Sequence, residues 1–140
     1  TLEEQIEVAS RLELLEIEIV GIFRNGSQKR NQFRNRSLEK LNINFSLGEN
    51  DLAKIEVKDL YIILEKPNGE VIYDISNGSG SFTFEKREMF FTIKEEVLID
   101  KSEKKLSVEY LINDEFNKGT YSVKLYTDEY KIGSGEFLIK

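Results

Sequence analysis

The sequence contains no cysteine, no histidine, no tryptophan and only one proline among its 140 residues. Without cysteine, the chain can form no disulfide, thiolate nucleophile, iron–sulfur site or cysteine-ligated zinc site. Without histidine, it has no Ser-His-Asp triad, no imidazole acid–base catalyst and no histidine-ligated metal. These absences exclude much of the usual catalytic chemistry. We therefore expect a protein that is not an enzyme and that has no cofactor and no metal site.

Long hydrophobic runs are also lacking. No run approaches the roughly 18 apolar residues of a membrane span, and no signal peptide is visible. The absence of cysteine suits a reducing cytoplasm, which is the favoured compartment, and equally a disulfide-free periplasmic domain. Because the chain starts at Thr1 rather than Met, we expect that an upstream segment has been removed. A signal or anchor in that segment would make the periplasm the alternative compartment.

The charges are unevenly distributed along the chain. Twenty Lys and Arg residues against 26 Asp and Glu residues give a formal net charge of −6, which argues against a dedicated polyanion-binding protein. Residues 1–18 carry six glutamates and one arginine, whereas residues 24–40 carry six basic residues against the single acid Glu39. The chain is therefore acidic overall, with one basic segment at residues 24–40.

The length suits one domain with a short segment in front of it. Folding of such a chain hides roughly two-thirds of the surface that the unfolded chain exposes, which is enough for a core without disulfides. Residues 1–11 predict a short helix, with Leu2, Ile6 and Ala9 on one face. Because so few residues do not form a stable helix alone in water, we interpret residues 1–11 as the end of a helical or coiled-coil segment and residues 12–140 as the domain.

From Leu15 onward the apolar residues recur with a period of two, which predicts strands. About eight short strands with turns at intervals of about 8–12 residues indicate an all-β, Ig-like antiparallel sandwich. We expect Leu15 to point into the core, residues 25–37 to form a long loop, residues 71–75 to form a returning strand and residues 76–81 to form a flexible loop. The core is expected from three alternating sets: Leu41, Ile43 and Phe45; Leu106, Val108 and Tyr110; Tyr121, Val123 and Leu125.

A more specific feature lies in residues 117–123, with the sequence NKGTYSV. The glycine turn followed by Tyr121 resembles the tyrosine corner of immunoglobulin-like domains, in which the tyrosine hydroxyl bonds back to nearby backbone. In antibody domains a cysteine stands two positions after this tyrosine, and here the residue is Val123. The resemblance therefore implies two sheets held together by apolar packing alone.

The whole stretch from Leu15 to Lys140 is similar to a family of uncharacterised bacterial proteins typical of the Bacteroides group. The matching segments are the basic loop leading into residues 36–50, then residues 59–74, and residues 119–140. The resemblance implies an N-terminal coiled coil joined to a C-terminal Ig-like domain. Some members are labelled chromosome-partitioning proteins, which implies an ATPase. This chain lacks the G-x-x-x-x-G-K-[ST] phosphate loop, so we do not transfer that activity.

Several side chains are candidates for chemical sites. The carboxylates Glu95, Glu96, Asp114 and Glu115 are candidates for a glycosidase pair, but solvated surface charge is the favoured interpretation. Residues 113–117 hold the densest cluster of oxygen ligands without the alternating register of a calcium loop, so no metal site is predicted. The rings of Tyr61, Tyr73, Tyr126 and Tyr130 are candidates for a carbohydrate-binding platform or for simple cross-strand packing.

The basic segment is the best candidate for a functional surface. Its candidate partner-binding residues are Arg24, Lys29, Arg30, Phe33, Arg34, Arg36 and Lys40. Arginine is a common anchor for an acidic protein partner, and arginine beside an aromatic ring also suits nucleic acid. The remaining alternatives are docking on the Glu-rich residues 1–18, within one chain or between subunits, and a disordered solvated loop. We expect a non-catalytic protein–protein interaction or assembly module, with nucleic-acid binding and carbohydrate binding as alternatives.

Overall fold

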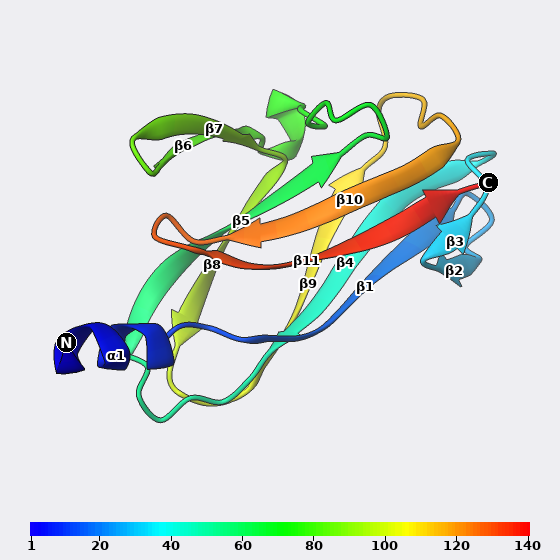
Figure 1. The fold of residues 1–140 in the computed structure, drawn as a ribbon. Helices are drawn as coiled ribbons and strands as arrows, with labels where there is room; N and C mark the ends of the chain where they lie inside the picture. The colour runs from blue at the N-terminus through cyan, green and yellow to red at the C-terminus, as the bar shows by residue number, and fades with distance from the viewer.

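The computed structural model describes residues 1–140 except for the side chain of Ile6. It contains one short α-helix, one 3₁₀ turn and eleven strands (Figure 1). In chain order they are α1 (Leu2–Ala9), β1 (Leu14–Phe23), β2 (Gln28–Arg30), β3 (Gln32–Phe33), β4 (Leu38–Leu47), β5 (Glu56–Glu65), the 3₁₀ turn Ile75–Asn77, β6 (Gly80–Phe84), β7 (Arg87–Phe91), β8 (Ile93–Ile99), β9 (Lys104–Leu111), β10 (Gly119–Tyr126) and β11 (Lys131–Ile139). In the described part of the chain, no helix is long and apolar enough to cross a membrane.

The strands form two packed sheets and one separate hairpin. The first sheet has the order β2-β1-β4-β9, the second has the order β3-β11-β10-β5-β8, and β6 pairs with β7 alone. The pairs are antiparallel except for the short parallel contact between β3 and β11. The neighbours β1-β4-β9 and β11-β10-β5 reproduce the A-B-E and G-F-C arrangement of an immunoglobulin-like sandwich. The predicted all-β, Ig-like fold is confirmed, with more strands than the eight expected.

The core lies between the two sheets, where alternate residues of each strand meet. Eight of the nine predicted core residues are buried, and Leu106 is half-buried at the rim. β4 lies between β1 and β9, and β10 lies between β11 and β5, whereas β9, which carries Leu106, is the edge strand of the first sheet. Successive side chains of a strand point to opposite faces of its sheet, so one alternating set from each strand faces the core.

Two of the predictions about strands are wrong. Leu15 is 49% exposed rather than buried, because the register of β1 against β4 shifts between Leu14 and Glu16 and Leu14 packs against the core instead. Residues 71–75 form no strand, since only Val71 bridges to Glu65. The chain then enters the 3₁₀ turn, where the backbone N–H of Ser76 donates to the carboxylate of Asp74.

The segment expected to be a flexible loop is held by hydrogen bonds. The carboxylate of Asp74 accepts from the backbone N–H and the hydroxyl of Ser76 and from the amide of Asn77. The side chain of Asn77 in turn donates to the carbonyl and accepts from the N–H of Leu111 at the end of β9. The segment is thereby tied to the first sheet.

The β6–β7 hairpin forms a third layer on the outer face of the second sheet (Figure 1). Phe82 of the hairpin stacks on Tyr61 of β5 with ring centroids 4.0 Å apart, and Phe84 meets Tyr126 of β10 edge-on at 5.0 Å. The chain bends from β7 into β8 at Thr92, whose hydroxyl donates to the carbonyl of Ile72 and accepts from an N–H of β5. The hairpin thus covers two of the tyrosines considered for carbohydrate binding.

The tyrosine corner is present. The hydroxyl of Tyr121 donates to the carbonyl of Asn117 at 2.7 Å. Gly119, between them, has φ +142°, a conformation that favours glycine. Val123 is fully buried in the position of the antibody cysteine, so apolar packing joins the sheets.

The register of the strands gives the sandwich two distinct ends. At one end lie α1 and the connections β4–β5, β8–β9 and β10–β11, as the pairs Leu14↔Leu47 and Tyr126↔Lys131 show. At the other end lie residues 24–37, the β9–β10 connection and the C-terminal residue, as the pairs Phe23↔Leu38 and Gly119↔Ile139 show (Figure 1). Strands of about ten residues separate the two ends by roughly 30 Å.

Candidate functional site

Residues 24–37 are folded rather than a long loop. After the turn at Gly26, β2 runs back along the edge of β1, pairing residues 28–30 with residues 20–22. At Asn31 the backbone takes φ 59°, and its side-chain oxygen accepts from the N–H of Ile19 at 2.9 Å. The chain then crosses to the second sheet, where β3 lies parallel to the end of β11. The predicted loop is wrong because pairs with distant strands order these residues, and such pairs leave no local periodicity.

Phe33 anchors this segment in the core. It is 1% exposed, meets Phe23 edge-on at 6.2 Å and stacks on Phe137 at 5.9 Å. Gly21 of β1 makes room for the ring, since a Cβ there would stand 3.0 Å from it. The expectation that Phe33 contacts a partner is wrong, because its ring is buried. Its position as a single aromatic residue within a polar segment was the sequence signal for an anchor.

The basic side chains of the segment point to solvent. Arg24, Lys29, Arg30, Arg34 and Arg36 are all exposed. Arg30 lies 3.5 Å from a carboxylate oxygen of Glu18 on β1, whereas no ion pair among the described residues involves Arg24, Arg34 or Arg36. Lys40 lies apart from them, on the outer face of the first sheet, where it pairs with Glu109 at 3.4 Å.

Two further segments and the C-terminal residue complete this end of the molecule. The backbone N–H of Lys140 donates to the carbonyl of Phe33 at 2.9 Å, and the amide of Asn35 donates to the carbonyl of Phe116 at 2.8 Å. Pro67 lies directly against Gly119, at the end of the β9–β10 connection. We call residues 24–37, 66–70 and 112–118 together with Lys140 the basic end. The basic end carries eight Lys and Arg residues against three Asp and Glu residues. Arg24 and Arg36 line a shallow depression of about 450 Å³ there.

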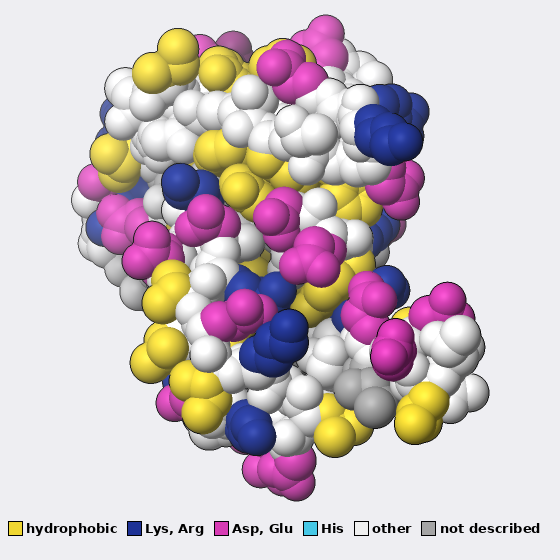
Figure 2. Space-filling model, turned by 90° about the vertical axis from the view of Figure 1, so that its left-hand side faces the viewer, with side chains coloured by type: hydrophobic (Ala, Val, Ile, Leu, Met, Phe, Trp, Pro, Cys, Tyr) yellow, Lys and Arg dark blue, Asp and Glu magenta, His cyan; other side chains and the backbone are white. Residues whose placement is uncertain are grey.

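The opposite end has the opposite charge. We call residues 1–13, 48–55, 100–103 and 127–130 the acidic end, which carries ten Asp and Glu residues against three Lys and Arg residues. In Figure 2, which faces this side of the molecule, α1 stands out from the body at the lower right. Sequence reasoning located the glutamates of residues 1–18 but missed the three connections that fold beside α1.

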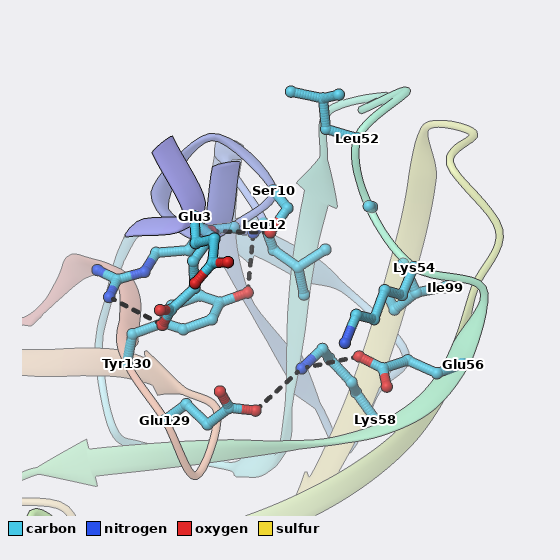
Figure 3. Close-up of a pocket in the computed structure, with 13 residues that line it drawn as sticks. Glu3, Ser10, Leu12, Leu52, Lys54, Glu56, Lys58, Ile99, Glu129 and Tyr130 are labelled. Carbon is cyan, nitrogen blue, oxygen red and sulfur yellow. Dashed lines mark hydrogen bonds and ion pairs between the residues drawn. The ribbon is translucent and has the colours of Figure 1, made fainter. Parts of the chain in front are cut away.

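A hollow of about 320 Å³ lies between α1 and the end of the sandwich (Figure 3). Within it, the ammonium of Lys58 lies 3.2 Å from a carboxylate oxygen of Glu56 and 3.6 Å from one of Glu129. Burial lowers the pKa of Lys58, but the hydrogen bond and charge of Glu56 and the neighbouring negative charge outweigh burial and raise it overall. The positive charge of Lys58 is therefore satisfied inside the hollow.

Tyr130 forms another wall of the hollow. Its hydroxyl accepts from the backbone N–H of Leu12 at 2.9 Å, and the guanidinium of Arg11 lies 5.0 Å from its ring centroid. These contacts join the residues that follow α1 to the β10–β11 turn. The ring of Tyr130 is thus already occupied by Arg11.

The carboxylates and tyrosines that the sequence offers as candidates do not come together in one site. Glu95 and Glu96 are successive residues of β8 and point to opposite faces of the sheet, and Asp114 and Glu115 lie at the basic end. No group of three or more acidic residues that could hold a metal occurs among the described residues. Tyr73 is the exposed member of the tyrosine set, with Phe90 edge-on at 5.8 Å.

A family model described as a domain of unknown function, DUF8428, matches residues 15–140. The chain belongs to the DUF8428 family. No curated protein and no solved structure matches the chain. The residues matched to DUF8428 include the whole basic end and all strands from the second residue of β1 onward, whereas α1 precedes the match.

Proposed function

We propose that this DUF8428 domain is a non-catalytic protein-interaction module whose basic end binds an acidic protein surface. One observation carries the proposal: the exposed arginines stand on a folded segment that Phe33 anchors in the core. A surface that is ordered before binding loses little conformational entropy when the complex forms. The planar guanidinium of arginine binds carboxylates through paired hydrogen bonds, which favours an acidic partner.

The other partner classes receive less support. Nucleic-acid binding through base stacking needs an accessible ring, and the aromatic residue of the basic segment is buried. The net charge of −6 on the whole chain also repels phosphates. For carbohydrate binding, Tyr61 and Tyr126 lie beneath the hairpin. The expected coiled coil stays a prediction, since α-helix within the described part of the chain is limited to the eight residues of α1.

Capture from a lysate of the source cells, with and without nuclease treatment, tests the proposed function. The bait is the unaltered chain, compared with a basic-end variant carrying Arg24→Glu, Arg34→Glu and Arg36→Glu. A control with Lys86→Glu, Arg87→Glu and Lys94→Glu has the same change in net charge on exposed residues of the β6–β7 hairpin and β8, which belong to neither end. We expect the unaltered chain and the control to retain the same proteins and the basic-end variant to lose them.

Two outcomes would contradict the proposal. Retention of the same proteins by the basic-end variant would show that another surface binds them. Capture that disappears after nuclease treatment, with loss of DNA or RNA binding in the basic-end variant, would assign the basic end to nucleic acid instead.

A further inference from the structure

We infer that the acidic partner of the basic end is the acidic end of a second copy of this chain, so that the domain associates head to tail. The inference rests on the proposed function and names its partner. It starts from the separation of charge along the sandwich. The basic end has an excess of five positive side chains and the acidic end an excess of seven negative ones, and all ten carboxylates of the acidic end are exposed.

The two ends cannot neutralise each other within one molecule. They lie roughly 30 Å apart along the strands, whereas the Debye length at 0.1 M salt is about 10 Å. The unpaired arginines Arg24, Arg34 and Arg36 therefore keep an outward positive field, and the acidic end keeps its negative one. When a second copy lies end to end in the same orientation, the basic end of one copy faces the acidic end of the other. The attraction between these opposite charges favours and steers association.

The acidic end also offers apolar surface that such a contact would cover. Leu2 and Val8 of α1 are exposed, as are Leu52 and Ile55 of the β4–β5 connection. In the lower half of Figure 2, hydrophobic side chains lie beside carboxylates on this face. Arginine suits such a mixed surface because its aliphatic stem packs on apolar groups while its guanidinium binds carboxylates.

The geometry of the contact determines the kind of assembly. A head-to-tail contact uses different surfaces on the two copies, so each pair leaves one basic end and one acidic end free. Further copies add at both ends, and an open chain grows rather than a closed dimer. Because the contact is largely between exposed charges, we expect it to be weak and sensitive to salt.

Sedimentation velocity over a concentration series measures this association directly. At about 20 mM NaCl, where the Debye length is about 20 Å, the weight-average sedimentation coefficient should rise with protein concentration. At about 300 mM NaCl, where the Debye length is about 6 Å, it should fall to the monomer value. A value for the unaltered chain that stays monomeric at low salt up to millimolar protein would overturn the inference.

Two complementary variants decide which surfaces meet. The basic-end variant, with Arg24→Glu, Arg34→Glu and Arg36→Glu, keeps its acidic end. An acidic-end variant with Glu13→Lys, Glu49→Lys and Glu103→Lys keeps its basic end. These glutamates lie on three neighbouring connections of the acidic end. The backbone N–H of Gly48 donates to the carbonyl of Glu13, and the backbone N–H of Asn50 donates to the carbonyl of Lys101.

Each variant alone should be monomeric at low salt, because neither has both complementary ends. Their equimolar mixture should associate, because the intact basic end of the acidic-end variant meets the intact acidic end of the basic-end variant. The control variant with Lys86→Glu, Arg87→Glu and Lys94→Glu should associate like the unaltered chain. Circular dichroism of every variant checks that the fold is kept.

The outcomes separate this inference from the proposed function. A mixture that stays monomeric, or single variants that still associate, would overturn head-to-tail assembly. If the basic-end variant nevertheless loses the proteins captured from the lysate, the interaction module stands and its partner is a different acidic protein. If neither capture nor self-association depends on the basic end, both proposals fail.

Discussion

The hydroxyl of Tyr121 donates a hydrogen bond to the backbone carbonyl of Asn117, four residues earlier, at 2.7 Å. The same ring stacks on Phe116 at 5.2 Å and on Phe137 at 4.9 Å. Through these contacts Tyr121 fixes the β9–β10 connection, which belongs to the basic end, against the core of the sandwich. No covalent link reinforces the corner, since the chain has no cysteine.

Substitution of Tyr121 separates the contribution of the hydrogen bond from that of the ring. Tyr121→Phe should lower the free energy of unfolding by about 1–2 kcal/mol, because the carbonyl of Asn117 loses its partner. Tyr121→Ala should lower it by about 3–5 kcal/mol, because it also leaves a cavity. Urea denaturation measures both values. Equal stability of the Phe variant and the unaltered chain would mean that the hydrogen bond contributes nothing.

Phe33→Ala tests the anchor of the basic segment. Loss of the buried ring should lower the free energy of unfolding by about 3–5 kcal/mol, whereas Arg34→Ala on the adjacent exposed residue should change it by less than about 0.5 kcal/mol. The N–H groups of Asn31 and Lys140, which donate to Ile19 and Phe33, should exchange faster with solvent in the Phe33 variant. Unchanged exchange at both positions would contradict the role of Phe33 as an anchor.

The sequence predicted the features that depend on regular alternation of apolar and polar residues along a strand. The core sets of β4, β9 and β10 follow from their period of two, and the glycine turn before Tyr121 identified the corner. The bulge at Leu14 was not predictable in this way, because one extra residue in a strand makes the side chains beyond it point to the opposite face of the sheet. Leu15 is consequently exposed while the alternation placed it inside.

For the candidate site, the sequence predicted which residues are basic but not how they fold. The sequence indicated a basic segment, but β2 and β3 are three and two residues long and are ordered by pairing with β1 and β11 rather than by local preference. The acidic end is formed by four segments that are far apart in the sequence. Its charge becomes evident only when the topology brings those segments together.

The ionisation of Tyr110 predicts a loss of stability at alkaline pH. Burial raises the pKa of Tyr110 to about 12, and the negative charges of Asp74 and Asp114 add to the effect. An unfolded tyrosine ionises near pH 10, so between about pH 10 and 12 the unfolded chain loses this proton while the folded chain retains it. The stabilisation is complete below about pH 10 and is lost as the pH rises through that interval.

Urea denaturation at about pH 9 and about pH 11 measures this effect in the unaltered chain and in Tyr110→Phe. The Phe variant should lose less of its free energy of unfolding between the two pH values. Some loss should remain, because burial also raises the pKa of Tyr61 and of Tyr121. Identical losses in the two proteins would exclude Tyr110 as a source of the pH dependence.

Asp59 and Glu96 are direct cross-strand partners on the outer face of the second sheet. Like charges placed opposite each other destabilise a sheet, and opposite charges stabilise it, by about 0.2–1 kcal/mol. Glu96→Lys should therefore raise the free energy of unfolding, with a smaller gain at high salt. Glu88→Lys, opposite Thr83 on the hairpin, is the matched control and should show no such gain. A less stable Glu96 variant would contradict the pairing.

The opposite charges of the basic end and the acidic end can be tested for contact by cross-linking. A carbodiimide joins lysine amines to carboxylates without a spacer, and an equimolar mixture of unlabelled and nitrogen-15-labelled chains distinguishes links between copies from links within one. At low salt, mixed-isotope links should join Lys29, Lys118 or Lys140 to carboxylates of the acidic end, and high salt should remove them. Mixed-isotope links confined to lysines outside the basic end, or none at all, would contradict head-to-tail assembly.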